Sequence, residues 1–195
     1  MIKGSALRRI KFLMVLWNFS YYLYDDIRRG RFLGVILIGL GNLLPDFLCF
    51  SFIRPIFWKM SGVRMVDATS SVIRKNVFIE YPHNLTIGKN FQVNIDTYLD
   101  TNEKITIGDN VTISLSCNIL TTSHSGLNHA EISMEPVVIK DHCLIYANCN
   151  ILPGAILEEG VILAAGSVLK GETEPWSLYA GNPAKFIRKI TSFRV

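Results

Sequence analysis

One histidine stands where the regular pattern of this chain breaks, and its chemistry is that of a general base. His124 occupies the last regular position before an interruption that lasts until Ile139. A neutral imidazole has a pKa close to physiological pH, so it can take a proton from a hydroxyl group as that group attacks a carbonyl. We therefore expect His124 to be catalytic; the alternative is an exposed loop histidine. His129, inside the interruption, is either a substrate-binding residue or an exposed loop residue.

The element that must position these residues is a repeat with a period of six. An aliphatic residue recurs through the last third of the chain at Ile139, Ile145, Ile151, Leu157, Leu163 and Leu169. Four residues after each stands a small or β-branched residue: Cys143, Cys149, Ala155, Val161, Ser167 and Thr173. A period of six fits neither an α-helix nor simple strand alternation, and it is typical of a β-helix in which about three hexads form one coil.

The same repeat extends back through the middle of the chain. In-phase runs occur at Ile73 and Ile79, at Ile87, Val93 and Leu99, and at Ile107, Ile113 and Ile119, with Val111, Cys117 and Ser123 in the small places. Between runs the phase slips by two residues, which we interpret as corner bulges that leave the core intact. The largest break follows His124, so we expect a segment near 125–136 to leave the coil as an extruded loop.

Composition limits the classes of function. The chain has 195 residues and 20 basic against 16 acidic residues, an excess too small to indicate nucleic-acid binding. Three of its four cysteines occupy small inward places of the repeat, so we expect reduced core cysteines rather than a metal or redox motif.

The chain divides into three parts. We expect an apolar helical segment over 1–60, the coil over 61–173 and a short terminating cap over 174–195. Two helices joined at Gly30 are the simplest interpretation of the first part. Pro45 and Asp46 interrupt its second apolar stretch and argue against a membrane span, so contact of residues 7–57 with a membrane face or with an oligomer is favoured.

Three pieces of the sequence resemble the hexapeptide-repeat acyltransferases, and more narrowly the sugar O-acetyltransferases of bacterial polysaccharide assembly and the galactoside and maltose acetyltransferases. They cover about 73–190 and read Tyr81-Pro82-His83-Asn84 leading to Asn90-Phe91-Gln92-Val93-Asn94, then Thr121-Thr122-Ser123-His124-Ser125, and finally Ile151-Leu152-Pro153-Gly154, Ala165-Gly166-Ser167-Val168 and Gly181-Asn182-Pro183-Ala184-Lys185.

The resemblance implies a left-handed parallel β-helix, a homotrimer with its active sites between subunits, and acetyl transfer from acetyl-CoA to a sugar hydroxyl without a metal. The family's catalytic histidine falls on His124 and its site asparagine on Asn94, while an acidic position that contacts the acceptor falls on Asp100. Taken alone, Asn94 and Asp100 also fit solvated turn residues.

The resemblance also suggests where acetyl-CoA binds. Phosphates favour cations and free backbone N–H groups, and small residues let the pantetheine arm lie against the backbone. The residues expected there are Tyr146, Ala165, Gly166, Ser167, Lys170, Lys185 and Arg188. The chain has Leu144-Ile145-Tyr146 where relatives have Trp-Ile-Gly, so Tyr146 is expected to narrow the groove.

Other classes of function compete with this interpretation. An N-acetyltransferase acting on an amino-sugar would share most of the machinery. A zinc enzyme of the γ-carbonic anhydrase type would need three converging histidines, and no third histidine has the right phase. A non-catalytic β-helix scaffold would not require His124 or Asn94.

Overall fold

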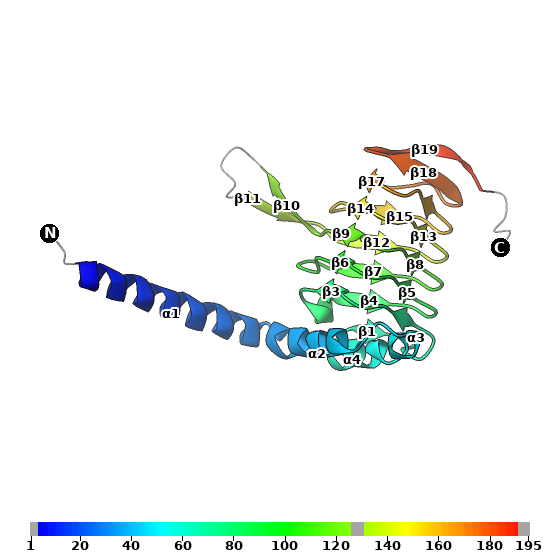
Figure 1. Ribbon diagram of the computed structural model, residues 1–195. Coiled ribbons are helices and arrows are strands. Elements are labelled where there is room, and N and C mark those ends of the chain that lie inside the picture. The colour runs from blue at the N-terminus through cyan, green and yellow to red at the C-terminus, as the bar shows by residue number, and fades with distance from the viewer. Residues whose placement is uncertain (1–3, 126–130, 191–195) are drawn as a thin grey trace.

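The chain was examined as a computed structural model, which describes residues 4–125 and 131–190. Short parallel strands wind into a coil with three faces, and helices cover the end at which the coil begins (Figure 1). This confirms the β-helix predicted from the period of six. The helices are α1 (Gly4–Arg28), α2 (Arg31–Leu43), α3 (Leu48–Ser51) and α4 (Arg54–Met60).

Each face of the coil is one sheet, parallel throughout except for the last two strands of the second sheet, which pair in antiparallel fashion. The first sheet holds β1 (Arg64–Met65), β4 (Leu85–Ile87), β7 (Ile105–Ile107), β12 (Val137–Ile139) and β15 (Ile156–Leu157). The second holds β2 (Val72–Ile73), β5 (Gln92–Val93), β8 (Thr112–Ile113), β13 (Leu144–Ile145), β16 (Ile162–Leu163), β18 (Ser177–Gly181) and β19 (Ala184–Lys189). The third holds β3 (Phe78–Ile79), β6 (Tyr98–Leu99), β9 (Asn118–Ile119), β14 (Asn150–Ile151) and β17 (Val168–Leu169).

The core is a set of aliphatic columns. In the second sheet, for example, Ile73, Val93, Ile113, Ile145 and Leu163 pair in register on successive coils. All five are buried, because strand side chains alternate between the axis and the outside. Cys117, Cys143 and Cys149 are buried, unpaired thiols in the small places, as the repeat predicted.

The corners of the coil use left-handed backbone. At the tight corners that follow the first and second sheets, the third residue after the inward aliphatic residue has a positive φ, as at Asn90 (φ 54°), Asn110 (φ 57°) and Gly166 (φ 72°). Asparagine and glycine tolerate this conformation best. The Nδ2 of Asn90 also donates to Oδ1 of Asn110 at 2.9 Å, so one corner braces the next.

The phase slips are longer corners, as expected. After β6 the chain makes a wider turn in which Thr101 is fully buried and its Oγ1 accepts from the backbone N–H of Tyr81 at 2.7 Å. Thr121 occupies the same place after β9, and its Oγ1 accepts from the N–H of Glu103 at 3.0 Å. The equivalent corner after β3 carries the short 3₁₀ helix η1 (Pro82–Asn84).

The break after Ile119 is a β-hairpin. β10 (Thr122–Ser125) pairs with β11 (Glu131–Met134) in antiparallel fashion and projects from the coil (Figure 1). The extruded segment therefore begins at Thr122, three residues earlier than the sequence pattern suggests. The placement of Ser123 in a small inward position is wrong, because Ser123 belongs to the hairpin and its Oγ lies 3.1 Å from Oγ of Ser133.

The helices at the base are fixed to the coil by one buried arginine. Arg54 is 1% exposed, and its guanidinium donates to the carbonyl oxygens of Gly41, Leu44, Pro45 and Ile73 at 2.9–3.3 Å. The expected helix break at Gly30 is present, with φ 69°. The second apolar stretch is not one helix, because the chain turns near Pro45 and continues as α3 and α4.

Candidate active site

The hairpin presents His124 to solvent. His124 lies opposite Ile132 in the hairpin register, and Thr122 lies opposite Met134. The imidazole is exposed, whereas the base of the hairpin is part-buried against the coil. A side chain placed on a projecting hairpin can reach groups that do not belong to its own coil.

Asp100 holds the base of that hairpin. It is 5% exposed, and its Oδ2 accepts from the backbone N–H groups of Thr121 at 3.3 Å and Thr122 at 3.0 Å. Its Oδ1 accepts from the backbone N–H of Asn102 at 3.2 Å and from the same residue's Nδ2 at 2.5 Å. Both carboxylate oxygens are thus engaged, so in this arrangement the side chain fixes backbone two residues before His124 rather than facing a cleft.

A chain of hydrogen bonds continues from this point to the helices. Nδ2 of Asn102 also donates to Oε2 of Glu80 at 2.6 Å, and the hydroxyl of Tyr98 donates to Oε1 of Glu80 at 2.6 Å. Burial, together with the hydrogen bond to the Glu80 carboxylate, raises the pKa of Tyr98 above its usual value, so the phenol stays protonated. Arg31 of α2 completes the path by donating to the backbone oxygen of Glu80 at 3.1 Å.

Asn94 stands on a different edge of the coil. The backbone N–H groups of Asn94, Ser114 and Tyr146 donate to the coil above at 2.8–2.9 Å, so the three residues form one column beside the second sheet. Oδ1 of Asn94 accepts from the N–H of Ile95 at 2.8 Å. Within the described residues its Nδ2 has no hydrogen-bond acceptor, which leaves a donor available to a ligand.

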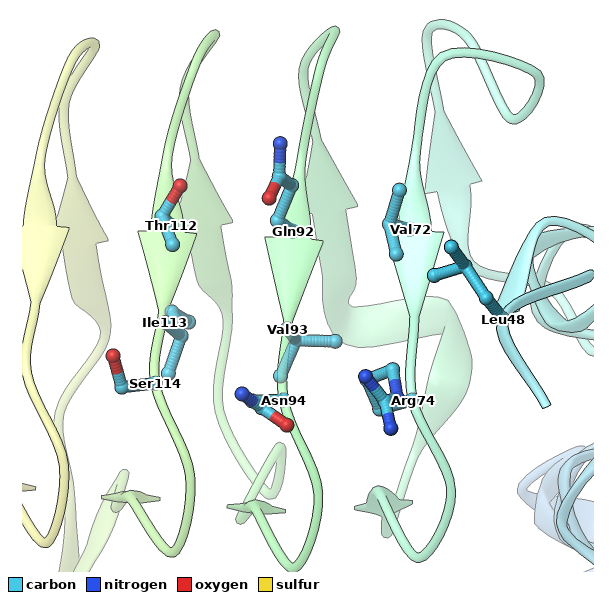
Figure 2. Close-up of a pocket in the computed structure, with 9 residues that line it drawn as sticks. All are labelled: Leu48, Val72, Arg74, Gln92, Val93, Asn94, Thr112, Ile113 and Ser114. Carbon is cyan, nitrogen blue, oxygen red and sulfur yellow. The ribbon is translucent and has the colours of Figure 1, made fainter. Parts of the chain in front are cut away.

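A pocket of about 210 Å³ opens at the lower end of this column. Figure 2 shows Arg74, Asn94 and Ser114 side by side on three successive coils, with Leu48 of α3 closing one end. The other lining residues are Val72, Gln92, Val93, Thr112 and Ile113. The lining therefore combines a cation, an amide and hydroxyls with apolar groups.

The residues expected to hold acetyl-CoA lie toward the upper end of the same edge. Tyr146 is 45% exposed in the column above Ser114. Ala165 and Gly166 are exposed one coil further up, and no atom lies within 4 Å of the position that a Cβ on Gly166 would take. Ser167 is buried, and its Oγ accepts from the N–H of Gly181 at 3.2 Å, so its side chain faces the core.

The expected cations are all exposed at this end of the coil. Lys170 follows β17, while Lys185 and Arg188 lie on β19 of the terminal hairpin. Small exposed residues with cations beyond them suit a long ligand that carries phosphates at one end.

The single chain does not bring His124 and Asn94 together. Figure 1 shows the hairpin of β10 and β11 projecting on the side of the coil opposite to β5, β8 and β13, and His124 belongs to β10. His129 lies outside the described residues.

Comparisons with known proteins identify the family. Residues 136–171 match the model for the bacterial transferase hexapeptide, six repeats. The putative colanic acid biosynthesis acetyltransferase WcaF of Escherichia coli is 34% identical over 136 residues, which cover 68% of this chain and 75% of that protein. The chain belongs to the hexapeptide-repeat acetyltransferases, a family of acetyl-CoA-dependent acyltransferases.

The likeness extends to fungal proteins and to a solved structure. The putative acetyltransferase YJL218W of Saccharomyces cerevisiae is 35% identical, but the match spans 62% of this chain and only 63% of the yeast protein. A maltose O-acetyltransferase structure from Clostridium difficile has a TM-score of 0.73 at 28% identity, covering 83% of this chain and 87% of that one. The coil is accordingly the left-handed parallel β-helix of the family.

The protein has a second polar pocket, which the sequence did not predict. The pocket holds about 200 Å³ and is lined by Arg29, Tyr81, His83, Asn84, Asn102 and Met134. Met134 belongs to the hairpin strand opposite Thr122, so the pocket reaches the base of the element that carries His124. The Tyr-Pro-His-Asn piece pointed to this corner, but nothing in the sequence joined it to Arg29 or Met134.

Among the described residues, no three histidine, cysteine, aspartate or glutamate side chains gather where they could hold one ion.

Proposed function

We propose that this protein transfers the acetyl group of acetyl-CoA to a sugar hydroxyl during assembly of a surface polysaccharide, with His124 as the general base. The observation that carries the proposal is the single edge on which Asn94, Ser114, Tyr146 and Ala164 follow one another along the coil, with exposed Ala165 directly after Ala164. That edge offers the Nδ2 hydrogen-bond donor of Asn94 at one end, small residues further up and cations beyond them. A solved acetyltransferase of Vibrio cholerae with the same fold holds acetyl-CoA, which supports acetyl-CoA as the acetyl donor.

The chemistry needs one proton to move twice. His124 takes the proton of the acceptor hydroxyl while its oxygen attacks the thioester carbonyl, which gives a tetrahedral oxyanion. Collapse of the oxyanion breaks the carbon–sulfur bond, and the imidazolium returns the proton to the thiolate. The products are an acetyl ester and free CoA. Asn94 contributes its available Nδ2 as a hydrogen-bond donor to the reacting groups.

A homotrimer would complete the site. The two halves of the machinery lie on different sides of a rigid coil, so His124 can meet the Asn94 edge only if that edge belongs to another subunit. A head-to-tail contact repeated three times closes a ring, which satisfies every interface. The proposal therefore places each active site between two subunits.

The pocket at Arg29 and Met134 is the proposed acceptor side. It offers a cation, two amides and an imidazole, which suit the hydroxyl and anionic groups of a glycan. His129 remains a proposed acceptor contact. Asp100 is proposed to position the hairpin instead of touching the acceptor, because its oxygens already accept four hydrogen bonds from backbone and Asn102. We place the enzyme in the cytoplasm, at the inner face of the membrane where lipid-linked glycans are assembled.

The test is acetyl transfer to a panel of sugars, followed by release of CoA and by mass spectrometry of the product. Mild alkali cleaves an ester but not an amide, so the product also separates O-acetylation from N-acetylation. His124→Ala is expected to lower kcat by about a hundredfold or more. His142→Asn is the matched control, since His142 also lies on the outside of the coil but has a positive φ that asparagine tolerates. Full activity of His124→Ala would refute the mechanism.

A mixing experiment tests the shared site. His124→Ala and Asn94→Ala chains, each inactive alone, are unfolded together and refolded. If the two residues come from different subunits, activity returns to about a quarter of wild type, because one in four pairings at an interface unites both intact residues. No recovery from a mixture that assembles as trimers would place both residues in one subunit or remove one from the site.

A further inference from the structure

The helices at the base of the coil expose an unusually large apolar surface. Exposed side chains there are mostly aromatic or aliphatic, and many are more than half exposed: Trp17 74%, Phe19 64%, Tyr22 65%, Tyr24 65%, Leu33 64%, Leu43 78%, Phe47 66% and Leu48 64%. We call this set, with its supporting helices α1–α4, the basal surface. Exposed apolar side chains gathered on one set of helices indicate an interaction site.

Helix α1 extends away from the coil. It runs for 25 residues and projects from the base of the coil, where α2 is its neighbour (Figure 1). Within the described part of the chain, no helix is long and apolar enough to cross a membrane. Trp17, Tyr21, Tyr22 and Tyr24 have ring systems that are apolar with one polar atom, the type that concentrates at the boundary between lipid and water.

The charge of the basal surface selects among possible occupants. Residues 1–60 contain nine Lys and Arg but only three Asp and Glu. Each of those acids is already paired: Asp25 with Arg29 at 2.8 Å, Asp26 with Arg31 at 3.1 Å and Asp46 with Arg74 at 2.7 Å. The excess cations therefore meet no unpaired carboxylate within this segment.

We infer that the basal surface binds an anionic lipid bilayer, with α1 lying in the interfacial plane and the coil standing away from it. A second copy of this chain would bring one positively charged base against another, whereas anionic headgroups complement the charge and acyl chains accept the apolar residues. Binding of the bilayer is independent of catalysis. The consequence for the acceptor does rest on the proposed function: Arg29, at the junction of α1 and α2, lines the acceptor pocket, so that pocket opens close to the membrane and suits a lipid-linked glycan.

Vesicle sedimentation of the full chain tests the inference. Phosphatidylcholine vesicles are compared with vesicles that contain phosphatidylglycerol, at low and at high salt. We expect the protein to pellet with the anionic vesicles at low salt, with partitioning that falls about tenfold or more in high salt or on pure phosphatidylcholine. Failure to pellet with anionic vesicles at low salt would overturn the inference.

Matched variants show which surface is responsible. The double variant Trp17→Glu with Phe19→Glu changes exposed side chains, so the fold is kept, and it is expected to stay in the supernatant. Leu115→Glu with Ile187→Glu adds the same charge to exposed positions on the coil and the terminal hairpin, and it is expected to pellet like wild type. Equal loss in both variants would refute a specific basal surface.

Two further readouts separate the alternatives. Light scattering after gel filtration reports whether Trp17→Glu with Phe19→Glu alters the number of subunits; a change in assembly without vesicle binding by wild type would assign the surface to a second copy. Acetyl transfer to a free sugar is expected to be unchanged in that variant. A Trp17→Glu with Phe19→Glu variant that no longer binds vesicles but still transfers acetyl groups would support both the basal surface and the proposed function. A wild-type chain that binds vesicles but transfers no acetyl group would refute the proposed function and leave this inference standing.

Discussion

Replacing Asp100 by asparagine is expected to weaken the base of the hairpin that carries His124. Asp100→Asn keeps the size of the side chain but turns one carboxylate oxygen into an NH₂ group. Four N–H donors point at the two oxygens, at 2.5–3.3 Å. Whichever way the new amide is oriented, its NH₂ group faces two N–H groups that have lost their acceptor.

The magnitude follows from burial. Asp100 is 5% exposed, so water replaces little of what is lost. A hydrogen bond to a charged group contributes about 1.5–3 kcal/mol, and an orphaned buried donor costs about 1–3 kcal/mol. Allowing for relaxation at half-buried Asn102, we expect the free energy of unfolding to fall by about 2–4 kcal/mol. Two of the four donors are backbone N–H groups of Thr121 and Thr122, which lie just before His124. Because the substitution weakens the hold on this backbone, kcat should also fall as His124 loses its fixed position.

Denaturant unfolding and steady-state kinetics measure the two effects. Asp96→Asn is the control, since Asp96 is exposed, has a positive φ that asparagine tolerates and keeps an oxygen to accept from Asn76 at 3.1 Å; it should change stability by less than about 0.5 kcal/mol. A direct contact of Asp100 with the acceptor would instead raise KM for the acceptor and leave stability unchanged. That result would refute the positioning role and restore the role that the family resemblance implies.

Four further outcomes follow from particular contacts. Arg54→Met should lower the free energy of unfolding by about 3–5 kcal/mol, because it removes a buried guanidinium that donates to four carbonyl oxygens. An unchanged denaturation midpoint would show that these hydrogen bonds do not hold the helices to the coil. Hydrogen bonds from Arg74 hold the pKa of Asp46 below its usual value, so this carboxylate stabilises the fold above about pH 4 and the contribution disappears as pH falls through the lowered pKa. Unfolding curves of wild type and Asp46→Asn should therefore differ at pH 7 and converge in acid; a constant difference would count against the pair. Burial raises the pKa of Cys143 to about 12, and Cys117 and Cys149 are also buried, so a thiol reagent at pH 8 should modify exposed Cys49 quickly and the other three only after unfolding. Gly88→Ala should destabilise the fold by about 1–3 kcal/mol, because its Cβ would lie 2.7 Å from the carbonyl oxygen of Gly108 and against the Asp109 carboxylate; thermal unfolding checks this.

The coil itself was predictable because a β-helix is nearly one-dimensional. Each hexad contacts the hexads above and below it. A period of six residues therefore predicts both where a short strand lies and which strand of the next coil it pairs with. The positions of Ile139, Ile145 and Ile151 in the repeat therefore predicted that they lie in buried columns along the axis. The helices at the base were less predictable, since the turn at Pro45 and the burial of Arg54 depend on packing against the first coil.

Some features of the candidate site also follow from the sequence, whereas others follow only from the tertiary structure. The sequence alone determined that His124 lies at a break in the repeat and that Asn94 occupies the second place of a hexad, beside the coil. Only the tertiary structure decided that Asp100 faces the backbone of the hairpin, that Arg29 and Met134 line one pocket, and that the hairpin projects on the side of the coil opposite to β5, after which Asn94 stands (Figure 1). The physical reason is that periodicity encodes which face a residue occupies, whereas the direction of a projecting hairpin and the closure of a pocket depend on contacts between segments that share no period.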